Sequence, residues 1–214
     1  MSTPKPVSPS APPFGQPGAC TEASCAKDRI FQAARNLFYK HGIRGVSVDA
    51  IAAEAGTTKV TLYRVFSSKD DLIVQCLQDH ITRFWQIWDE VVSAHEGDAR
   101  GQLEAVFGAL KTHMCAEEAE RGCPIVNTAV EIDDENHPAK HLIREHHGRI
   151  SSSLRELCKQ MGAQRPDELG DALTLLLEGS FASRLVFSSP KQVESVCEAA
   201  KALLDSPTLG TPRG

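Results

Sequence analysis

The residues best suited to chemistry lie in one short polar stretch, GTTKVTLYRVFSSKDDL, which runs from position 56 to position 72. Slim hydroxyl side chains let a backbone come close to a partner, while cationic and phenolic side chains can reach phosphates or the edges of bases. Leu62 and Phe66 lie one helical turn apart and would hold such a helix against a core. These features predict a small helix with a nucleic-acid-binding face formed by Thr58, Lys59, Thr61, Tyr63 and Arg64.

Two further short helices are predicted to position this stretch. In residues 26–41 the apolar side chains recur at the spacing of one helical face, and Gly42 follows as a helix end. Ser47 stands where an N-cap belongs, ahead of a second helix that closes at Gly56, and Thr58 can cap the third. Two helices joined by a tight glycine-containing turn, the second with a polar face, form a helix-turn-helix.

Longer helices are predicted over the rest of the chain. A serine at position 67 or 68 can cap a fourth helix that runs to about His95, and two aspartates in its first turn suit the helix dipole. Breaks rich in Gly, Pro and charge separate further helices, expected over residues 102–118, 125–131, 138–161, 167–187 and, after Ser189-Pro190, to about 204. The pattern predicts an all-α fold, in which an N-terminal three-helix helix-turn-helix domain is joined by a long helix to a C-terminal helical bundle domain.

Composition favours a globular chain. Of the 214 residues, 41% are hydrophobic and 24% charged, and no apolar run reaches the roughly 18 residues of a membrane helix. Six prolines crowd the first 19 residues, which lack the apolar middle of a signal peptide, so a disordered tail and a cytoplasmic location are expected. The seven cysteines include no CxxC pair, which argues against a disulfide framework. No sequence motif indicates an enzyme, a cofactor or a metal site.

Charge is divided unevenly along the chain. Residues 20–78 carry eight basic and six acidic side chains, whereas residues 79–214 carry 14 basic and 22 acidic ones. The difference in sign hints that the first part faces a polyanion, although ordinary surface charge explains so small an excess equally well.

The first part also resembles a known family. The segment AARNLFYKHGIRGVSVDAIAAEAGTTKVTLYRVFSSKDDL is similar to the N-terminal domain of TetR-type (TetR/AcrR-like) transcriptional regulators. The features of this domain occur here in the family's order. They are a helix and glycine, Ser-Val, IAxxAG, Thr-Lys, TLY, Phe, and SK followed by two acids and Leu. The segment GCPIVNTAVEIDDENHPA also resembles a phrase found in one branch of these regulators.

The resemblance implies a homodimeric, ligand-responsive regulator, expected to be a repressor that a small-molecule effector releases from a double-stranded DNA operator. Its paired reading heads would dock in successive major grooves. The implied DNA contacts are Ser47, Thr58, Lys59, Val60, Thr61, Tyr63, Arg64 and Lys69. The expected domains are a disordered tail over 1–22, the helix-turn-helix over 23–70, an effector-binding and dimerisation domain over 71–205, and a loose tail over 206–214.

Three residues depart from the family's pattern. Thr57 replaces a residue that is usually apolar, which predicts looser local packing. Val60 replaces a residue that is often small, so base preference is expected to be unusual, for example through a thymine methyl group. Val65 stands where His is common, and this removes one expected backbone contact.

An effector pocket is predicted between helices of the second part. Its candidate lining residues are Trp85, Trp88, Phe107, Met114, Asn127, Phe181 and Arg184, with Phe84 and His113 beside them, although each taken singly also fits plain core packing. The last two long helices carry wide apolar faces and small residues, which together with the resemblance predict a homodimer interface. Packing within one chain would explain the small residues equally well.

The sequence also contains residues that suit two other kinds of site. His137, His141, His146 and His147 are close enough in sequence to suggest metal binding, but flanking charge and the lack of a completing ligand favour a solvated helix. Cys123 would be a thiol sensor if it were exposed near positive charge, whereas a structural cysteine is the simpler interpretation. A helical-bundle sensor for a small molecule, metal or thiol, whose helix-turn-helix is not the main activity, remains the alternative.

Overall fold

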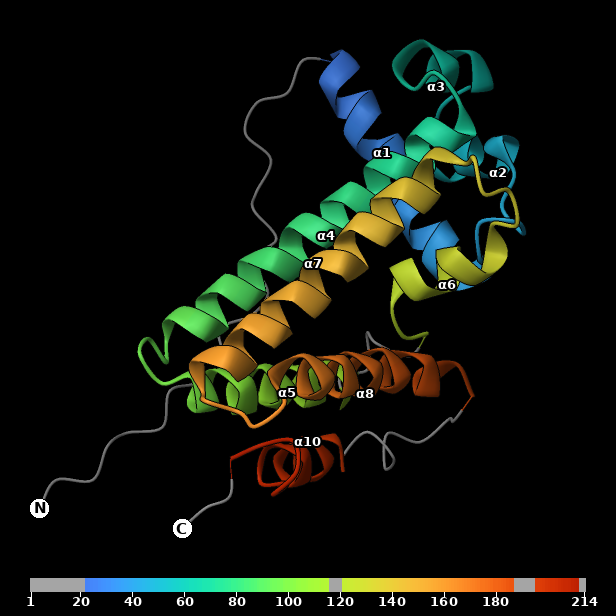
Figure 1. Ribbon diagram of the computed structural model, residues 1–214. Helices are drawn as coiled ribbons and strands as arrows, with labels where there is room; N and C mark the ends of the chain where they lie inside the picture. Colours follow the sequence, from blue (N-terminus) through green and yellow to red (C-terminus); the bar gives the residue numbers. More distant parts are fainter. Residues whose placement is uncertain (1–21, 116–120, 187–194, 212–214) are drawn as a thin grey trace, which may run out of the picture.

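The computed structural model describes residues 22–115, 121–186 and 195–211, and every regular element within these ranges is a helix (Figure 1). The all-α prediction is therefore confirmed. The helices are α1 (Glu22–His41), α2 (Val48–Glu54), α3 (Lys59–Val65), α4 (Lys69–Ser93), α5 (Ala99–Cys115), α6 (Pro124–Glu131), α7 (Pro138–Gln160), α8 (Pro166–Val186) and α10 (Val196–Leu204). None of them is long and apolar enough to cross a lipid bilayer.

The predicted caps begin three of these helices. The Ser47 hydroxyl accepts a hydrogen bond from the Ala50 amide at 3.1 Å, and the Thr58 hydroxyl accepts one from the Thr61 amide at 3.2 Å. Ser68, one of the two candidates for α4, accepts from its third helical amide at 3.0 Å. Each cap satisfies an amide that lacks a partner inside the helix and contributes about 1 kcal/mol.

The long helices α4 and α7 lie side by side, with α1, α2 and α3 gathered at one end (Figure 1). Helices α5 and α8 lie across the far part of this pair, and α10 lies outermost beyond them. We call α1–α3 with the first two turns of α4 the reading head. Its separate apolar cluster is built from Ile30, Ala33, Ala34, Val46, Ile51, Ala55, Leu62, Phe66, Leu72 and Cys76.

The boundary between the two parts lies inside α4. Leu72 and Cys76 pack with the reading head, while Ile73 and Leu77, on the neighbouring face, pack with the larger C-terminal core. A rigid helix that contributes to both cores transmits a change in one to the other, because its residues cannot move independently.

The end of the described chain is attached to the bundle, which corrects the expectation of a loose tail from residue 206. The Gln164 amide donates to the Gly210 carbonyl at 3.3 Å, and the Thr211 amide donates to the Leu204 carbonyl at 2.9 Å. A Cβ on Gly210 would lie 1.9 Å from that Leu204 oxygen, so only glycine permits this approach. The predicted tail over residues 1–21, the predicted start of the last helix at Ser189-Pro190 and residues 212–214 lie outside the described residues.

Candidate nucleic-acid interface and ligand pocket

Helix α3 presents a polar face anchored by two buried side chains. Leu62 and Phe66 are fully buried in the reading head, as their spacing predicts. On the opposite side Val60 is 80% exposed and Tyr63 47% exposed, and both are among the most exposed large apolar side chains of the described residues. Thr58, Lys59 and Arg64 are also exposed, while Thr61 is half-buried and bonded to Thr58. An apolar side chain held open to solvent between cations suits contact with a base edge.

Lys59 forms an ion pair with the second helix in the free protein. Its ammonium lies 3.1 Å from a carboxylate oxygen of Asp49 at the start of α2, and both side chains are at least half exposed. A pair this exposed contributes little to stability. Contact between Lys59 and a phosphate or a base would therefore compete with Asp49.

Lys69 lies differently from the sequence-based expectation. Its ammonium donates to the Ile43 carbonyl at 2.5 Å and stands over the Phe38 ring, and burial lowers its pKa. This arrangement ties the start of α4 to the loop between α1 and α2. We therefore leave Lys69 out of the proposed interface.

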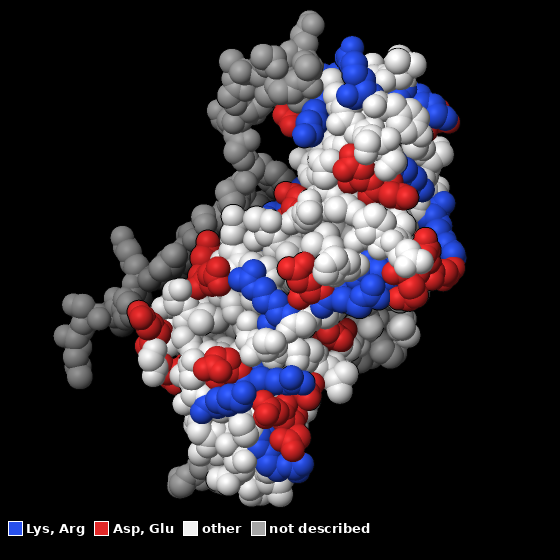
Figure 2. Space-filling model, turned by 45° about the horizontal axis from the view of Figure 1, so that its top comes forward, with Lys and Arg blue, Asp and Glu red and all other residues white. Residues whose placement is uncertain are grey.

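Ser47 is exposed at the start of α2, and its hydroxyl caps the helix. On the face shown in Figure 2, basic side chains stand among uncharged surface on the reading head, and acidic side chains lie close below them. The head therefore shows no continuous basic area on that face, in keeping with its small excess of positive charge.

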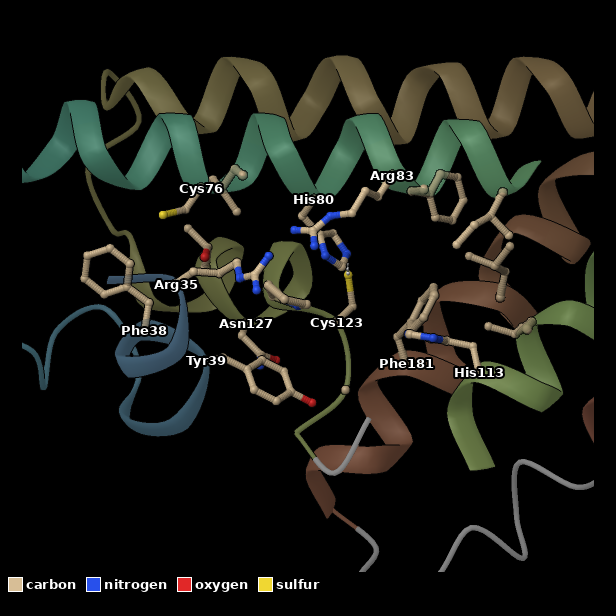
Figure 3. Close-up of a pocket in the computed structure, with 18 of the residues that line it drawn as sticks. Arg35, Phe38, Tyr39, Cys76, His80, Arg83, His113, Cys123, Asn127 and Phe181 are labelled. Carbon is tan, nitrogen blue, oxygen red and sulfur yellow. Dashed lines mark hydrogen bonds between the residues drawn. The ribbon is translucent and has the colours of Figure 1, made fainter. Parts of the chain in front are cut away.

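A cavity of about 430 Å³ lies between α1, α4, α5, α6 and α8. Its walls are largely apolar, with aromatic side chains from several helices and a group of polar side chains at one place (Figure 3). Both the volume and the character of the lining are typical of small-molecule sites.

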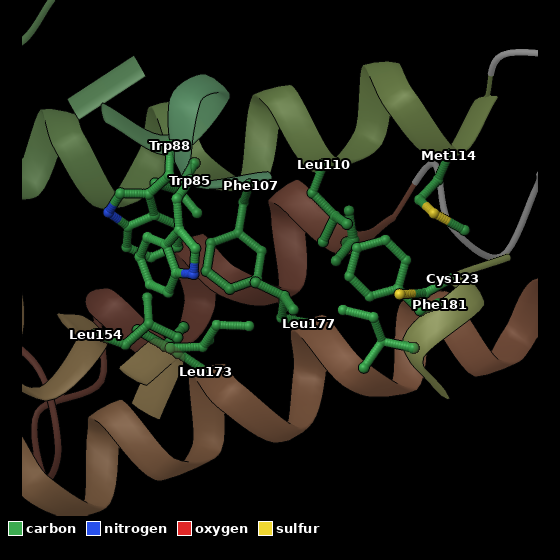
Figure 4. Packing of buried hydrophobic residues seen from close by; sticks show 14 of the residues in the cluster. Trp85, Trp88, Phe107, Leu110, Met114, Cys123, Leu154, Leu173, Leu177 and Phe181 are labelled. Atoms are coloured by element: carbon green, nitrogen blue, oxygen red, sulfur yellow. The ribbon is translucent and has the colours of Figure 1, made fainter. Parts of the chain in front are cut away.

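Three of the seven predicted pocket residues line this cavity, namely Trp88, Asn127 and Phe181, as do Phe84 and His113. The prediction is corrected for Trp85, Phe107, Met114 and Arg184, which are not among the lining residues. The first three are buried in the C-terminal core, where Trp85 and Phe107 pack against aliphatic side chains (Figure 4). Helical periodicity marks a buried face, but it does not show which buried positions border a gap.

Sequence reasoning missed the lining residues of α1 and the polar lining residues of α4. Arg35, Phe38 and Tyr39 come from α1, while His80 and Arg83 come from α4. The sequence of α4 did contain a signal for this part of the cavity wall. His80 and Arg83 lie on the same helical face as apolar lining residues spaced three and four positions apart. These apolar residues are Ile73, Leu77, Phe84, Ile87 and Val91. Polar residues within an apolar stripe indicate a wall that is not close-packed.

The polar side chains of the cavity converge (Figure 3). Arg35 and Arg83 both approach the same carboxylate oxygen of Asp79, Arg35 at 3.7 Å. His80 lies beside them, and burial together with the Arg83 charge lowers its pKa to about 3, so the ring is neutral. Asn127 donates to a backbone carbonyl at 2.8 Å, but its buried Oδ1 has no hydrogen-bond partner within the described residues.

Cys123 also faces this group. Its sulfur lies 3.9 Å from Nε2 of His80, and burial raises the pKa of the thiol. The thiol is therefore protonated at neutral pH, whereas a sensor cysteine needs an accessible thiolate. The geometry supports the structural interpretation of Cys123.

The short helix α6 is bound to the reading head at both ends. Before α6, the Arg121 amide donates to the Tyr39 hydroxyl at 3.0 Å. At its other end a Glu131 carboxylate oxygen accepts from the Arg44 amide at 2.9 Å, and the Arg44 side chain pairs with Asp133. Because α6 also lines the cavity, the cavity wall and the head are directly connected.

The α7 histidines do not form a solvated face, which corrects the sequence-based interpretation. His146 is buried and accepts a hydrogen bond from the Trp85 indole at 3.2 Å, and half-buried His147 lies 2.6 Å from Glu178. Only His141 of the four is exposed. His146 shares the buried face of α7 with Ala139, Ile143, Ile150 and Leu154, whose spacing was obscured by the intervening charges. In the described residues no three potential metal-binding side chains converge.

Comparison with known proteins agrees with this architecture. Residues 30–76 match bacterial regulatory proteins of the tetR family, and residues 99–200 match the tetracyclin repressor-like C-terminal domain. An uncharacterized HTH-type transcriptional regulator in the lacX 3' region of Lactococcus lactis subsp. lactis is 26% identical over 137 residues. The match spans 61% of this chain and 69% of that protein.

Two solved structures are similar over nearly their whole length. The TetR-family regulator SCO4454 from Streptomyces coelicolor is 30% identical with a TM-score of 0.74, over 84% of this chain and 94% of that one. The TetR family regulator CifR, solved with a 26 bp double-strand operator DNA, is 19% identical with a TM-score of 0.71, over 86% of this chain and 97% of that one. The second likeness shows the fold alone. Matched in both domains, the chain belongs to the TetR family of DNA-binding transcriptional regulators, which are not enzymes.

Proposed function

We propose that this protein is a homodimeric repressor that a small molecule releases from its operator, acting in the cytoplasm. The observation that carries the ligand response is the shared wall of the cavity. Arg35, Phe38 and Tyr39 belong to the helix that supports the reading head, so a ligand would touch the head directly. The description of the C-terminal family as repressor-like supports repression over activation.

The proposed DNA contacts are those on the exposed side of α3 and its cap, together with Ser47. Thr58, Lys59, Val60 and Thr61 would face bases, while Tyr63 and Arg64 would meet the phosphate backbone. The support is their common exposure and the burial of Leu62 and Phe66 behind them.

Dimerisation is proposed through α8 and α10. The outer side of α8 carries Leu175, which is 70% exposed, and Val186, which is 74% exposed, although its inner side is buried. The exposed residues of α10 include Ala199 and Ala202, whose small side chains allow another helix to approach closely.

The test begins with selection of bound DNA from random sequence by the purified full chain, followed by binding titrations at several salt concentrations. Lys59→Ala should weaken operator binding about tenfold and reduce the salt dependence, since it removes a cation from the interface. Tyr63→Phe should weaken binding without changing helicity, and Lys159→Ala, on the distant end of α7, is the matched control. Wild-type affinity in both α3 variants would remove the proposed contacts. A chain that selects no sequence would remove the proposed function.

A further inference from the structure

The polar end of the cavity has the chemistry of an acid-binding site. We propose that the effector is an amphipathic acid whose anionic group binds Arg35 and Arg83 in competition with Asp79, while its apolar body fills the rest of the cavity. This inference rests on the proposed function, because it names the class of ligand for the same cavity.

The first support is the charge balance. Two guanidinium groups that line a mostly apolar cavity approach one oxygen of one carboxylate, so this partly exposed cluster holds an excess positive charge. His80 lies beside them and is neutral, so it adds no charge to the cluster. Its ring can still donate one N–H to a bound anion. Arginine binds carboxylates with charge-assisted hydrogen bonds, which are about twice as strong as neutral ones.

The second support is the position of Glu131, the acidic residue that lines the cavity within the described part of the chain. The Glu131 carboxylate lies against Gly42, where an added Cβ would be 2.6 Å from its oxygen, and it accepts a hydrogen bond from the Arg44 amide. This negative charge is therefore held at the loop between α1 and α2. The carboxylate of a ligand bound at Arg35 and Arg83 would therefore not compete with Glu131 for a hydrogen-bond donor.

The third support is the orphan acceptor on α6. The buried Oδ1 of Asn127 has no partner within the described residues, while its amide nitrogen is bonded to the Arg121 carbonyl. A buried acceptor without a donor is destabilising, because it has lost its hydrogen bond to water. A hydroxyl or amide N–H on the ligand would satisfy it, so acids that carry such a donor should bind best.

The arrangement also indicates how binding of the acid would change the contacts of the reading head. Arg35 belongs to α1 and Asp79 to α4, so their ion pair joins the head to the long helix. An anion that takes over Arg35 removes this link. The apolar body, placed among Phe84, Trp88 and Phe181, would meanwhile press on α4 and α8.

The test compares acids with their uncharged isosteres. Naphthalene-2-acetate and decanoate, each beside the corresponding primary amide, are titrated into the full chain by calorimetry. At least one acid should bind about tenfold more tightly than its amide, a difference of about 1.4 kcal/mol. Arg83→Gln should abolish that preference, whereas Lys159→Gln should preserve it. Asp79→Asn should strengthen acid binding, because the competing carboxylate is gone.

Equal binding of acid and amide, a preference that survives Arg83→Gln, or failure of both acids to bind would each overturn the proposal. Weaker acid binding by Asp79→Asn would also overturn it. Displacement of operator DNA separates the two levels of inference. Release of the operator by the amides alone would sustain the proposed function and refute the acid site. Acid binding that releases no operator would sustain the acid site and refute the proposed function.

Discussion

Buried His146 should make the protein unfold more easily in mild acid. Its Nδ1 accepts a hydrogen bond from the Trp85 indole, and Arg149 stands 3.7 Å from the centre of that indole ring. Burial, with the nearby His147 and Arg149, lowers the pKa of His146 to about 4 from its ordinary value of 6.5. The unfolded chain therefore binds this proton at a higher pH than the folded chain does.

The sign and size of the effect follow from this difference. His146 contributes its full stabilisation above the unfolded pKa, and that stabilisation is lost as the pH falls from about 6.5 towards about 4. The whole difference corresponds to about 3 kcal/mol, of which about 2 kcal/mol is lost by about pH 5. His80, whose pKa is about 3, acts in the same direction and adds to the total loss.

Urea unfolding followed by circular dichroism at a fixed protein concentration, between about pH 7 and about pH 5, measures the effect. His146→Gln keeps an acceptor for the indole but does not titrate, so this variant should lose about 2 kcal/mol less than the wild type over that range. His141→Gln replaces the exposed histidine and should follow the wild type. An unchanged pH dependence in His146→Gln would refute the argument.

Three other outcomes are expected. Asp49→Asn should tighten operator binding severalfold in anisotropy titrations, because Lys59 loses its competing partner; weaker binding would contradict this role for Lys59. Leu175→Glu, on the exposed side of α8, should shift the chain towards monomer in light scattering while leaving its helicity unchanged, and an intact dimer would exclude this face. Gly210→Ala should lower the free energy of unfolding by about 1–3 kcal/mol, because its Cβ would overlap the Leu204 carbonyl; unchanged stability would show that the end of the chain yields freely.

The local elements could be predicted because their signals are local. Ser47, Thr58 and Ser68 cap their helices as expected, since a cap needs only its own amides two or three positions on. Leu62 and Phe66 are buried because they form the apolar face of a short helix, and only this face can pack against a core. The exposed side of α3 then follows by elimination.

The cavity could not be predicted in full because it depends on contacts between distant parts of the chain. Arg35 looks like a surface residue until α1 packs beside α4 and brings it to Asp79, the carboxylate that Arg83 already reaches within α4. His146 looks solvated until Trp85, 61 positions earlier, donates to it. Each of these side chains is polar in sequence, and only tertiary packing determines whether it meets water or a partner.

The bonds at the two ends of α6 also constrain protein engineering. A chimaera that joins this reading head to the C-terminal domain of another regulator would separate Tyr39 from Arg121, and Arg44 from Glu131 and Asp133. Such a hybrid would keep both halves folded and still lack the connection between the cavity wall and the reading head on which the proposed ligand response depends. Transplanting the five residues together, as one module with α6, is the design that this architecture recommends for building new biosensors.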